Sequence, residues 1–192
     1  MRLNRNFFQG KRTLNVGCGN DTFGTDFVDI YPSRKVIKCN VDEEKLPYKK
    51  ETFDVVYSRC NFEHLRCPRH FLDESYRVLK RRGILIIITD NANYIGYIIN
   101  RTHHGGYIGY GKEDVHYGLY TKEHLIAHLK SSGFKVLYAG YTNSDILCWR
   151  KNYIFHKRSL FGKVIETFGD ILPSELTKRI SCFRVAIVGL KI

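Results

Sequence analysis

The chain lacks any apolar run long enough to cross a bilayer. A membrane-spanning helix needs about 20 predominantly apolar residues, whereas the longest apolar run here, GILIIIT, occupies only residues 83–89. The N-terminal segment MRLNRNFFQGKRT carries charges but no apolar core of signal-peptide length. We therefore expect a cytoplasmic protein that is not exported.

Paired cysteine motifs are also absent. The six cysteines are scattered over 192 residues, and none forms a Cys-x-x-Cys pair. A chain of this length can bury a sufficient apolar core without cross-links, so we expect free thiols in a reducing compartment. Cys60, His64, Cys67 and His70 include zinc-ligand types, but their spacing matches no common finger. The sequence therefore predicts no metal site.

Acidic residues are few relative to basic ones: the chain contains 19 Asp and Glu and 31 Lys and Arg, which gives a net charge of +12. Such an excess favours anionic partners such as nucleic acid, phosphorylated substrates or lipid surfaces. A general basic bias in composition is the alternative. Residues 150–192 hold nine Lys and Arg against three Asp and Glu, and their apolar residues recur near helical spacing. Three interpretations of this basic region stay open: a cap on the active site or a homodimer face, contact with an anionic membrane surface, and contact with RNA.

Short β-branched runs alternate with helical patterns along the chain. Helices are predicted over 67–81 and 120–134, the second with Thr121 as its N-cap. Near-continuous apolar runs are typical of strands covered on both faces. Seven such runs predict strands, at 13–17, 26–30, 35–39, 53–58, 83–89, 134–141 and 183–191. The alternation favours a single α/β domain over 1–192 with a mostly parallel sheet.

The first predicted strand runs into a glycine turn, in TLNVGCGN. Gly17 and Gly19 allow a close backbone approach to a ligand, although a purely structural turn is equally common. The dinucleotide fingerprint Gly-x-Gly-x-x-Gly is absent, because Thr22 stands where its third glycine belongs. Asp29, at the end of the next strand in FVDIYPS, can accept both hydroxyls of a ribose. An ordinary loop aspartate is the alternative.

Five segments in this order resemble the class I S-adenosylmethionine-dependent methyltransferases, especially the small type 11 methyltransferase domains. They are LNVGCGN, FVDIYPS, CNVDEEKLPYKKETFDVVYSRCNFEHL, FLDESYRVLKRRGILIIITDNANY and VHYGLYTKEHLIAHLKSSGFKV. The resemblance covers about residues 13–141 and a last strand near 183–191. It implies a Rossmann-like three-layer α/β sandwich, a seven-stranded mostly parallel sheet with an antiparallel last strand, and S-adenosyl-L-methionine as cofactor.

The resemblance also assigns the cofactor site to residues at the ends of the first four strands. Asp29 would bind the ribose hydroxyls, Ile30 would pack on the adenine, and Asn40 stands where the family usually has an acid. An Asn side chain can still accept the adenine hydrogen bond. The implied residues, from the methionine end through the adenine to the methyl group, are Asn15, Gly17, Cys18, Gly19, Asp29, Ile30, Asn40, Val41, Ser58, Arg59 and Cys60.

Two segments depart from the family pattern. Residues 20–25 are too few for the usual helix of about three turns after the glycine turn. The short N-terminal segment leaves little material for a helical lid, so we expect 91–120 and 150–180 to be lid or acceptor-side insertions. Both follow late strands, where open α/β sheets place their ligand crevice.

Methyl transfer from a sulfonium depends chiefly on aligning the reactants, and a base assists when the acceptor is a hydroxyl or amine. His116 and His64 are the candidate bases, although His64 beside a helix start is also typical of local hydrogen bonding. The acceptor we expect is a small molecule, a glycan or a lipid-linked intermediate. The alternatives are an RNA methyltransferase, favoured by the charge, and a non-catalytic cofactor-binding or scaffold protein on the same fold.

Overall fold

The computed structural model describes residues 5–94, 115–142, 179 and 184–192. Most of the two predicted insertions, and most of the basic region 150–192, therefore lie outside the described residues. The predictions that these segments form a lid, a dimer face or an anionic-partner surface stay predictions.

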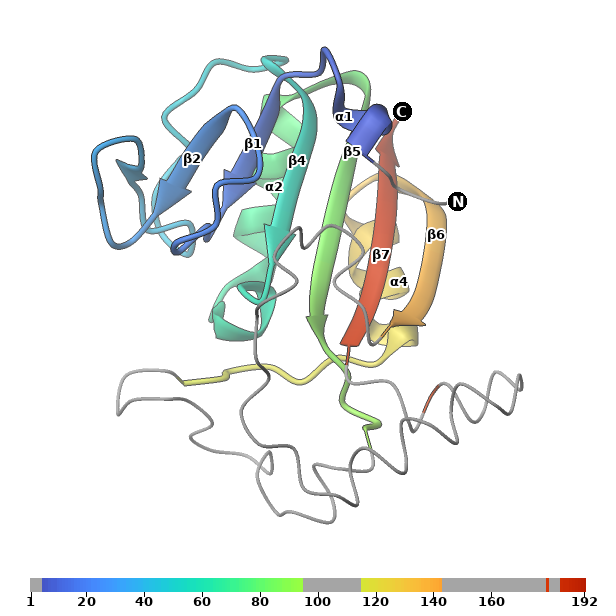
Figure 1. Cartoon of the computed structure of the whole chain (residues 1–192). Helices are drawn as coiled ribbons and strands as arrows, with labels where there is room; N and C mark the ends of the chain where they lie inside the picture. The colour runs from blue at the N-terminus through green and yellow to red at the C-terminus, as the bar shows by residue number, and fades with distance from the viewer. Residues whose placement is uncertain (1–4, 95–114, 143–178, 180–183) are drawn as a thin grey trace.

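Seven strands form one sheet in the order β3-β2-β1-β4-β5-β7-β6 (Figure 1). β1 to β5 pair in parallel, whereas β7 is antiparallel to both β5 and β6. The bounds are Thr13–Val16 for β1, Asp26–Asp29 for β2, Ile37–Lys38 for β3, Phe53–Arg59 for β4, Leu79–Asp90 for β5, Phe134–Thr142 for β6 and Arg184–Lys191 for β7. The predicted Rossmann-like α/β class, with a mostly parallel sheet and an antiparallel last strand, is confirmed.

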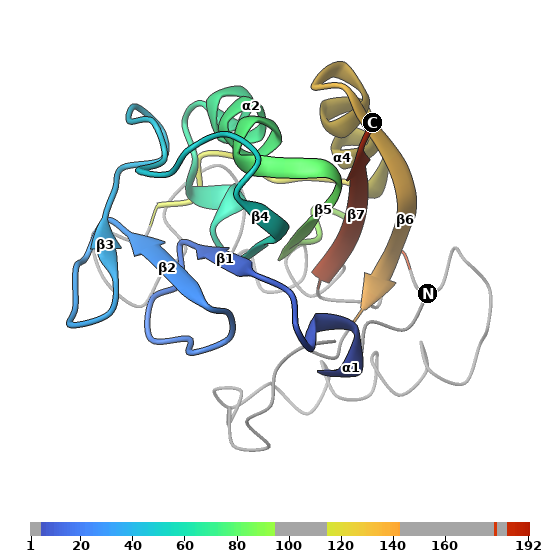
Figure 2. The same ribbon diagram turned by 90° about the horizontal axis from the view of Figure 1, so that it is seen from above.

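Two amphipathic helices cover one face of the sheet (Figure 2), namely α2 (Pro68–Val78) and α4 (Lys122–Ser131). α2 begins with Pro68 at its first position, where the missing N–H costs nothing. α4 begins after Thr121, whose Oγ1 accepts a hydrogen bond of 3.2 Å from His124 N, as the sequence predicts. Together they bury the larger of two apolar cores against the sheet. No helix of the described ranges has both the length and the apolarity needed to cross a bilayer.

Aromatic side chains cover the opposite face where the loop after β1 is too short to hold a helix. The short helix α1 (Arg5–Phe8) lies on this side (Figure 2). Phe23, from the loop between β1 and β2, packs edge-to-face between Phe8 at 4.7 Å and Tyr57 at 4.9 Å between ring centroids. These rings seal a smaller core formed by β4, β5 and β7. Three rings thus provide the cover that a helix would otherwise supply.

Several predicted boundaries are wrong. The helix predicted to end at residue 81 ends at Val78, and β5 starts at Leu79 rather than at Gly83. The amphipathic pattern continues past the helix because Leu79 is fully buried, but it is buried as a strand residue paired with Phe53. The predicted strand 35–39 is reduced to Ile37–Lys38, an exposed two-residue edge.

Candidate active site

The glycine turn joins the carboxyl ends of β1 and β2. Gly17 N donates to Val28 O at 2.9 Å, and Gly19 N donates to the Asp29 carboxylate at 2.8 Å. The other carboxylate oxygen of Asp29 accepts from Tyr31 N at 3.0 Å. Asp29 therefore holds two backbone segments together, and each of its oxygens keeps a further lone-pair position for a ligand hydroxyl.

The two glycines are required for different reasons. Both have left-handed backbone angles, with φ of 66° at Gly17 and 51° at Gly19, which favour glycine. A Cβ on Gly17 would overlap the side chain of Asn61, whereas a Cβ on Gly19 would meet no atom within 4 Å. Gly17 thus admits a neighbouring side chain, and Gly19 faces open space.

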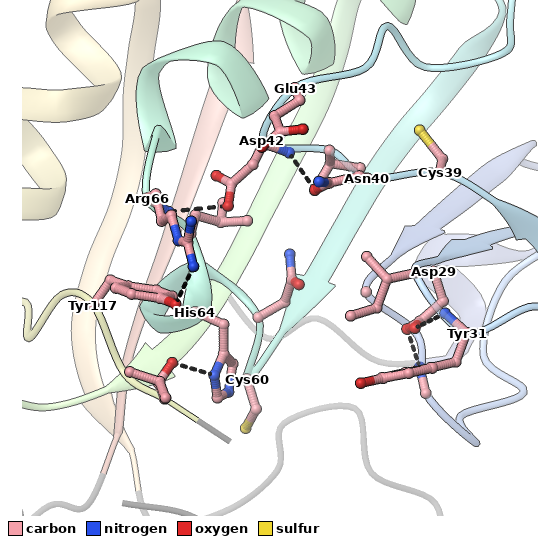
Figure 3. A pocket seen from close by; sticks show the side chains of 17 residues that line it. Asp29, Tyr31, Cys39, Asn40, Asp42, Glu43, Cys60, His64, Arg66 and Tyr117 are labelled. Carbon is pink, nitrogen blue, oxygen red and sulfur yellow. Dashed lines mark hydrogen bonds between the residues drawn. The ribbon is translucent and has the colours of Figure 1, made fainter. Parts of the chain in front are cut away.

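A pocket of about 860 Å³ lies over these strand ends, within the range usual for small-molecule sites. Figure 3 shows Asp29 and Tyr31 on one side of it, and His64, Arg66 and Tyr117 on the other. Seven of the eleven predicted cofactor residues line it: Gly17, Gly19, Asp29, Ile30, Asn40, Val41 and Cys60. The structure therefore brings the predicted residues of four strand ends around one cavity.

The other four predicted residues support the walls rather than line the pocket. Asn15 Nδ2 donates to Phe23 O at 2.9 Å, and Ser58 Oγ accepts from Asn61 Nδ2 at 3.3 Å. Arg59 lies 3.6 Å from the Asp21 carboxylate, an ion pair that anchors the turn. Burial, followed by the charge of Asp29, raises the pKa of Cys18 to about 11, so this residue is a neutral thiol at physiological pH.

Asn40 is engaged by its own loop. Its Oδ1 accepts a hydrogen bond of 3.2 Å from Asp42 N, a local turn that fixes the side chain. The same loop is tied to the start of α2, because the Asp42 carboxylate accepts from Arg66 N at 3.1 Å and from Cys67 N at 2.9 Å. Asn40 thus lines the pocket from a loop that these hydrogen bonds hold in place.

The two predicted histidines meet beyond the end of β4. His64 belongs to the 3-10 turn η1 (Phe62–His64), and its Nδ1 lies 3.0 Å from Val115 O. Its ring lies 4.5 Å from the ring of His116, measured between centroids. Tyr117 N and Gly118 N both donate to Glu63 O, at 2.8 and 3.1 Å, which fixes this segment against η1. Residues far apart in sequence thereby form one cluster.

Two buried carboxylates accompany the histidines. Glu63 is 1% exposed and accepts a hydrogen bond of 2.6 Å from Thr89 Oγ1. Asp90, at the end of β5, is 5% exposed and lies 3.9 Å from His116 Nδ1. Burial, followed by the charge of Glu63, raises the pKa of the neighbouring Cys60 to about 12, so its thiol stays protonated at neutral pH.

The sequence analysis did not predict Asn61, Asp90 or Arg66 as site residues. Asp90 could have been found, because it directly follows a predicted strand at the edge where the ligand crevice was expected. Arg66 could not, since its role depends on a distant partner: its guanidinium lies 4.7 Å over the Tyr117 ring and donates to Tyr117 OH at 2.7 Å.

The four residues with zinc-ligand side chains, Cys60, His64, Cys67 and His70, do not come together in the structure. His70 Nε2 lies 3.1 Å from Glu44 O, and the described residues whose ligand atoms gather do not include Cys67 or His70.

The sheet order defines an α/β protein of the Rossmann-like type, and the glycine turn with an acid at the next strand end is typical of nucleotide-binding members of this class. Residues 27–87 match the family model described as a methyltransferase domain. A crystal structure of a methyltransferase from Archaeoglobus fulgidus is 20% identical, with 97% of this chain and 89% of that chain covered and a TM-score of 0.63. One from Methanosarcina mazei is 11% identical, with 100% and 99% covered and a TM-score of 0.66.

An uncharacterized protein of Methanocaldococcus jannaschii is 33% identical over 98 residues, which cover 44% of this chain. The chain spans about half the length of this curated relative, since the match covers 48% of it. The match over residues 27–87 relates that part of the chain to methyltransferase domains, and the solved structures share its fold.

The chemistry of the pocket suits S-adenosylmethionine, the cofactor of the methyltransferases that share the fold. Asp29 offers acceptor positions for ribose hydroxyls at a strand end. Gly19 leaves open space where any side chain would intrude. Ile30, 48% exposed at the pocket rim, offers an apolar surface for a flat ring.

Proposed function

We propose that this chain transfers the methyl group of S-adenosylmethionine to a hydroxyl or amine of a small-molecule, glycan or lipid-linked acceptor. The observation that carries this proposal is that one pocket is lined by the glycine turn, by Asp29 and by His64. The bound cofactor supplies a methyl group activated by a sulfonium. The residues of the pocket then have to bind both partners and align them.

The cofactor is held by groups along the strand ends. Asp29 binds the ribose hydroxyls while its backbone partners keep the carboxylate oriented. Ile30 and Val41 enclose the adenine, and Asn40 faces its amino group from the braced loop. The methionine end lies along the turn Gly17–Cys18–Gly19, with Asn15 beneath it. Cys60 borders the amino and methyl groups at the end of β4, and Ser58 and Arg59 support this wall from behind.

The histidine cluster serves the acceptor. A backbone carbonyl can only accept a hydrogen bond, so the contact with Val115 O puts the proton of neutral His64 on Nδ1 and leaves the lone pair on Nε2. This nitrogen can take the proton that the acceptor loses as the new bond to the methyl carbon forms. His116 is the second candidate base, because the Asp90 carboxylate lies 3.9 Å from its Nδ1 and stabilises its protonated form.

The electrostatics of this end of the pocket support a small polar acceptor. Glu63 and Asp90 are buried close to the two imidazoles, and carboxylates repel the phosphates of a nucleic-acid backbone. The chain's net charge of +12 supports the alternative of an RNA acceptor. RNA binding that weakens steeply with salt, together with methylated RNA as product, would favour that alternative.

The proposal predicts that His116→Ala slows transfer far more than it weakens cofactor binding. General bases contribute about 100-fold or more to rate, so kcat should fall by about that factor, while the Kd of S-adenosylhomocysteine changes less than about threefold. Turnover is measured by mass spectrometry of methylated products from a panel of hydroxyl and amine acceptors. The matched control is His70→Gln, in a residue bonded to Glu44 O away from the cluster, and it should leave turnover unchanged.

Unchanged turnover in His116→Ala would remove this residue from the mechanism. Cofactor binding without methylation of any acceptor, RNA included, would instead favour a non-catalytic cofactor-binding or scaffold role.

A further inference from the structure

Glu63 lies at the centre of the buried polar cluster beyond β4. One of its carboxylate oxygens and one ring nitrogen each of His64 and His116 all lie within 4.8 Å of one another. Glu63, Cys60 and Asp90 form a second group under the same limit. We propose that Glu63, His64 and His116 bind a divalent transition-metal ion such as Zn²⁺ at the acceptor end of the pocket.

Each of the three ligands has an outer partner that orients it, as metal ligands in proteins usually do. His64 donates from Nδ1 to Val115 O at 3.0 Å, which directs Nε2 to the opposite side of the ring. Thr89 Oγ1 donates to one Glu63 oxygen at 2.6 Å, and the Asp90 carboxylate faces His116 Nδ1 at 3.9 Å. Each proposed ligand is thus oriented by a different group: a backbone carbonyl for His64, a hydroxyl for Glu63 and a carboxylate for His116.

The charges of the cluster also favour a bound cation. Glu63 and Asp90 are nearly fully buried beside the two imidazoles, and buried carboxylates in proteins are paired with cations or coordinate metals. Arg184 pairs directly with Asp90 across β5 and β7, and opposite charges in such cross-strand positions attract.

The donor types select the ion. Two imidazoles and one carboxylate suit Zn²⁺ or Fe²⁺, whereas Mg²⁺ and Ca²⁺ prefer oxygen ligands alone. Three protein ligands leave a coordination position for water or substrate, as in catalytic zinc sites. Cys60 is not part of the set, because its sulfur groups with Glu63 and Asp90 rather than with the two histidines.

The metal site goes beyond the proposed function, because metal binding can be read without any transfer reaction. It would change how the histidines serve the acceptor: a coordinated imidazole is a ligand and no longer takes a proton. A transfer rate that differs between metal-loaded and metal-free protein would distinguish these two modes.

The test uses the full, tag-free chain, stripped with a chelator and titrated with Co²⁺ and Zn²⁺. We expect one equivalent of Zn²⁺ by elemental analysis after dialysis, and visible Co²⁺ absorption without a thiolate charge-transfer band. Glu63→Gln and His116→Asn should each weaken binding by about tenfold or more. Cys67→Ser and His70→Gln, taken from the set that does not converge, should bind as the wild type does.

Wild-type protein that shows no visible Co²⁺ absorption and retains no Zn²⁺ would overturn the proposal, and so would a strong thiolate band or full binding by folded Glu63→Gln. If a variant fails to fold, as judged by circular dichroism, the wild-type Co²⁺ spectrum still decides. Titration of S-adenosylhomocysteine into the same samples separates the two proposals, since the cofactor can bind whether or not the metal does.

Discussion

At the scale of single residues, the site depends on the space around the two glycines that follow β1. Gly17 and Gly19 share left-handed backbone angles, yet only Gly17 is in contact with a neighbouring side chain, that of Asn61. The sequence alone indicates that a backbone approaches something at this turn. It does not reveal that one glycine faces Asn61 and the other faces open space, because that distinction depends on η1, more than forty residues further along.

Alanine at these two positions should therefore have separable effects. Gly17→Ala combines backbone strain of about 1–2 kcal/mol with overlap on Asn61, so it should lower the free energy of unfolding by about 2 kcal/mol or more. Gly19→Ala should cost only about the strain, but it should weaken S-adenosylhomocysteine binding by about tenfold, because its Cβ enters the pocket. Urea denaturation and calorimetric titration measure the two quantities. Equal losses of stability with unchanged affinity would contradict this account of the turn.

At the scale of elements, the connection from α2 to β5 shows where sequence patterns stop being informative. The apolar spacing of residues 67–81 continues smoothly, but the chain changes from helix to strand at Leu79, and a register shift follows in the pairing with β4. Arg82 then adopts a φ of 62°. A buried residue such as Leu79 fits the apolar face of a helix and a buried strand equally well. The boundary between α2 and β5 therefore depends on the pairing of Leu79 with Phe53. The Thr121 cap, by contrast, was predictable because it is a local hydrogen bond.

The strained position at Arg82 gives a direct test of this connection. Arg82 is exposed and has a left-handed φ, so Arg82→Gly should raise the free energy of unfolding by about 0.5–1 kcal/mol. Arg81 is equally exposed and has no left-handed φ, so Arg81→Gly should lower stability by a similar amount. Thermal denaturation of the two variants measures these changes in stability. A loss of stability in both would argue against the described turn.

At the scale of the whole molecule, the mostly parallel sheet with its antiparallel last strand and the position of the pocket were predictable, and the acceptor end was predictable only in part. The alternation of strands and helices is a property of the whole chain, and the pocket follows from the carboxyl ends of neighbouring parallel strands. His64 and His116 were expected individually. Their meeting with Glu63 and Asp90 depends on the segment 115–118 folding back onto η1 through backbone hydrogen bonds, for which no residue pattern is a signal.

Buried thiols and a buried tyrosine hydroxyl predict that the free energy of unfolding decreases at alkaline pH. Burial raises the pKa of Cys18 and Cys39 to about 11 from an ordinary value of 9.0, and that of Tyr120 to about 12 from 10.0. The folded state therefore holds protons that the unfolded chain releases. The stabilisation is fully present below pH 9 and is lost as pH rises through 11.

Urea unfolding at a series of pH values measures this effect. Cys39→Ala should flatten the decline between pH 9 and 11, because it removes one of the contributing groups. A free energy of unfolding that stays constant up to pH 11 would contradict the described burial.

The most direct test of the central claim is calorimetric titration of S-adenosylhomocysteine into folded wild-type protein, alongside Asp29→Asn and Asp26→Asn. Both aspartates lie on β2, but Asp29 faces the pocket and Asp26 pairs with Arg12 at 2.8 Å away from it. We predict one site in the wild type, at least about tenfold weaker binding in Asp29→Asn because a charged ribose acceptor is lost, and unchanged binding in Asp26→Asn. No heat of binding in well-folded wild-type protein, or equal affinity in all three proteins, would contradict the account.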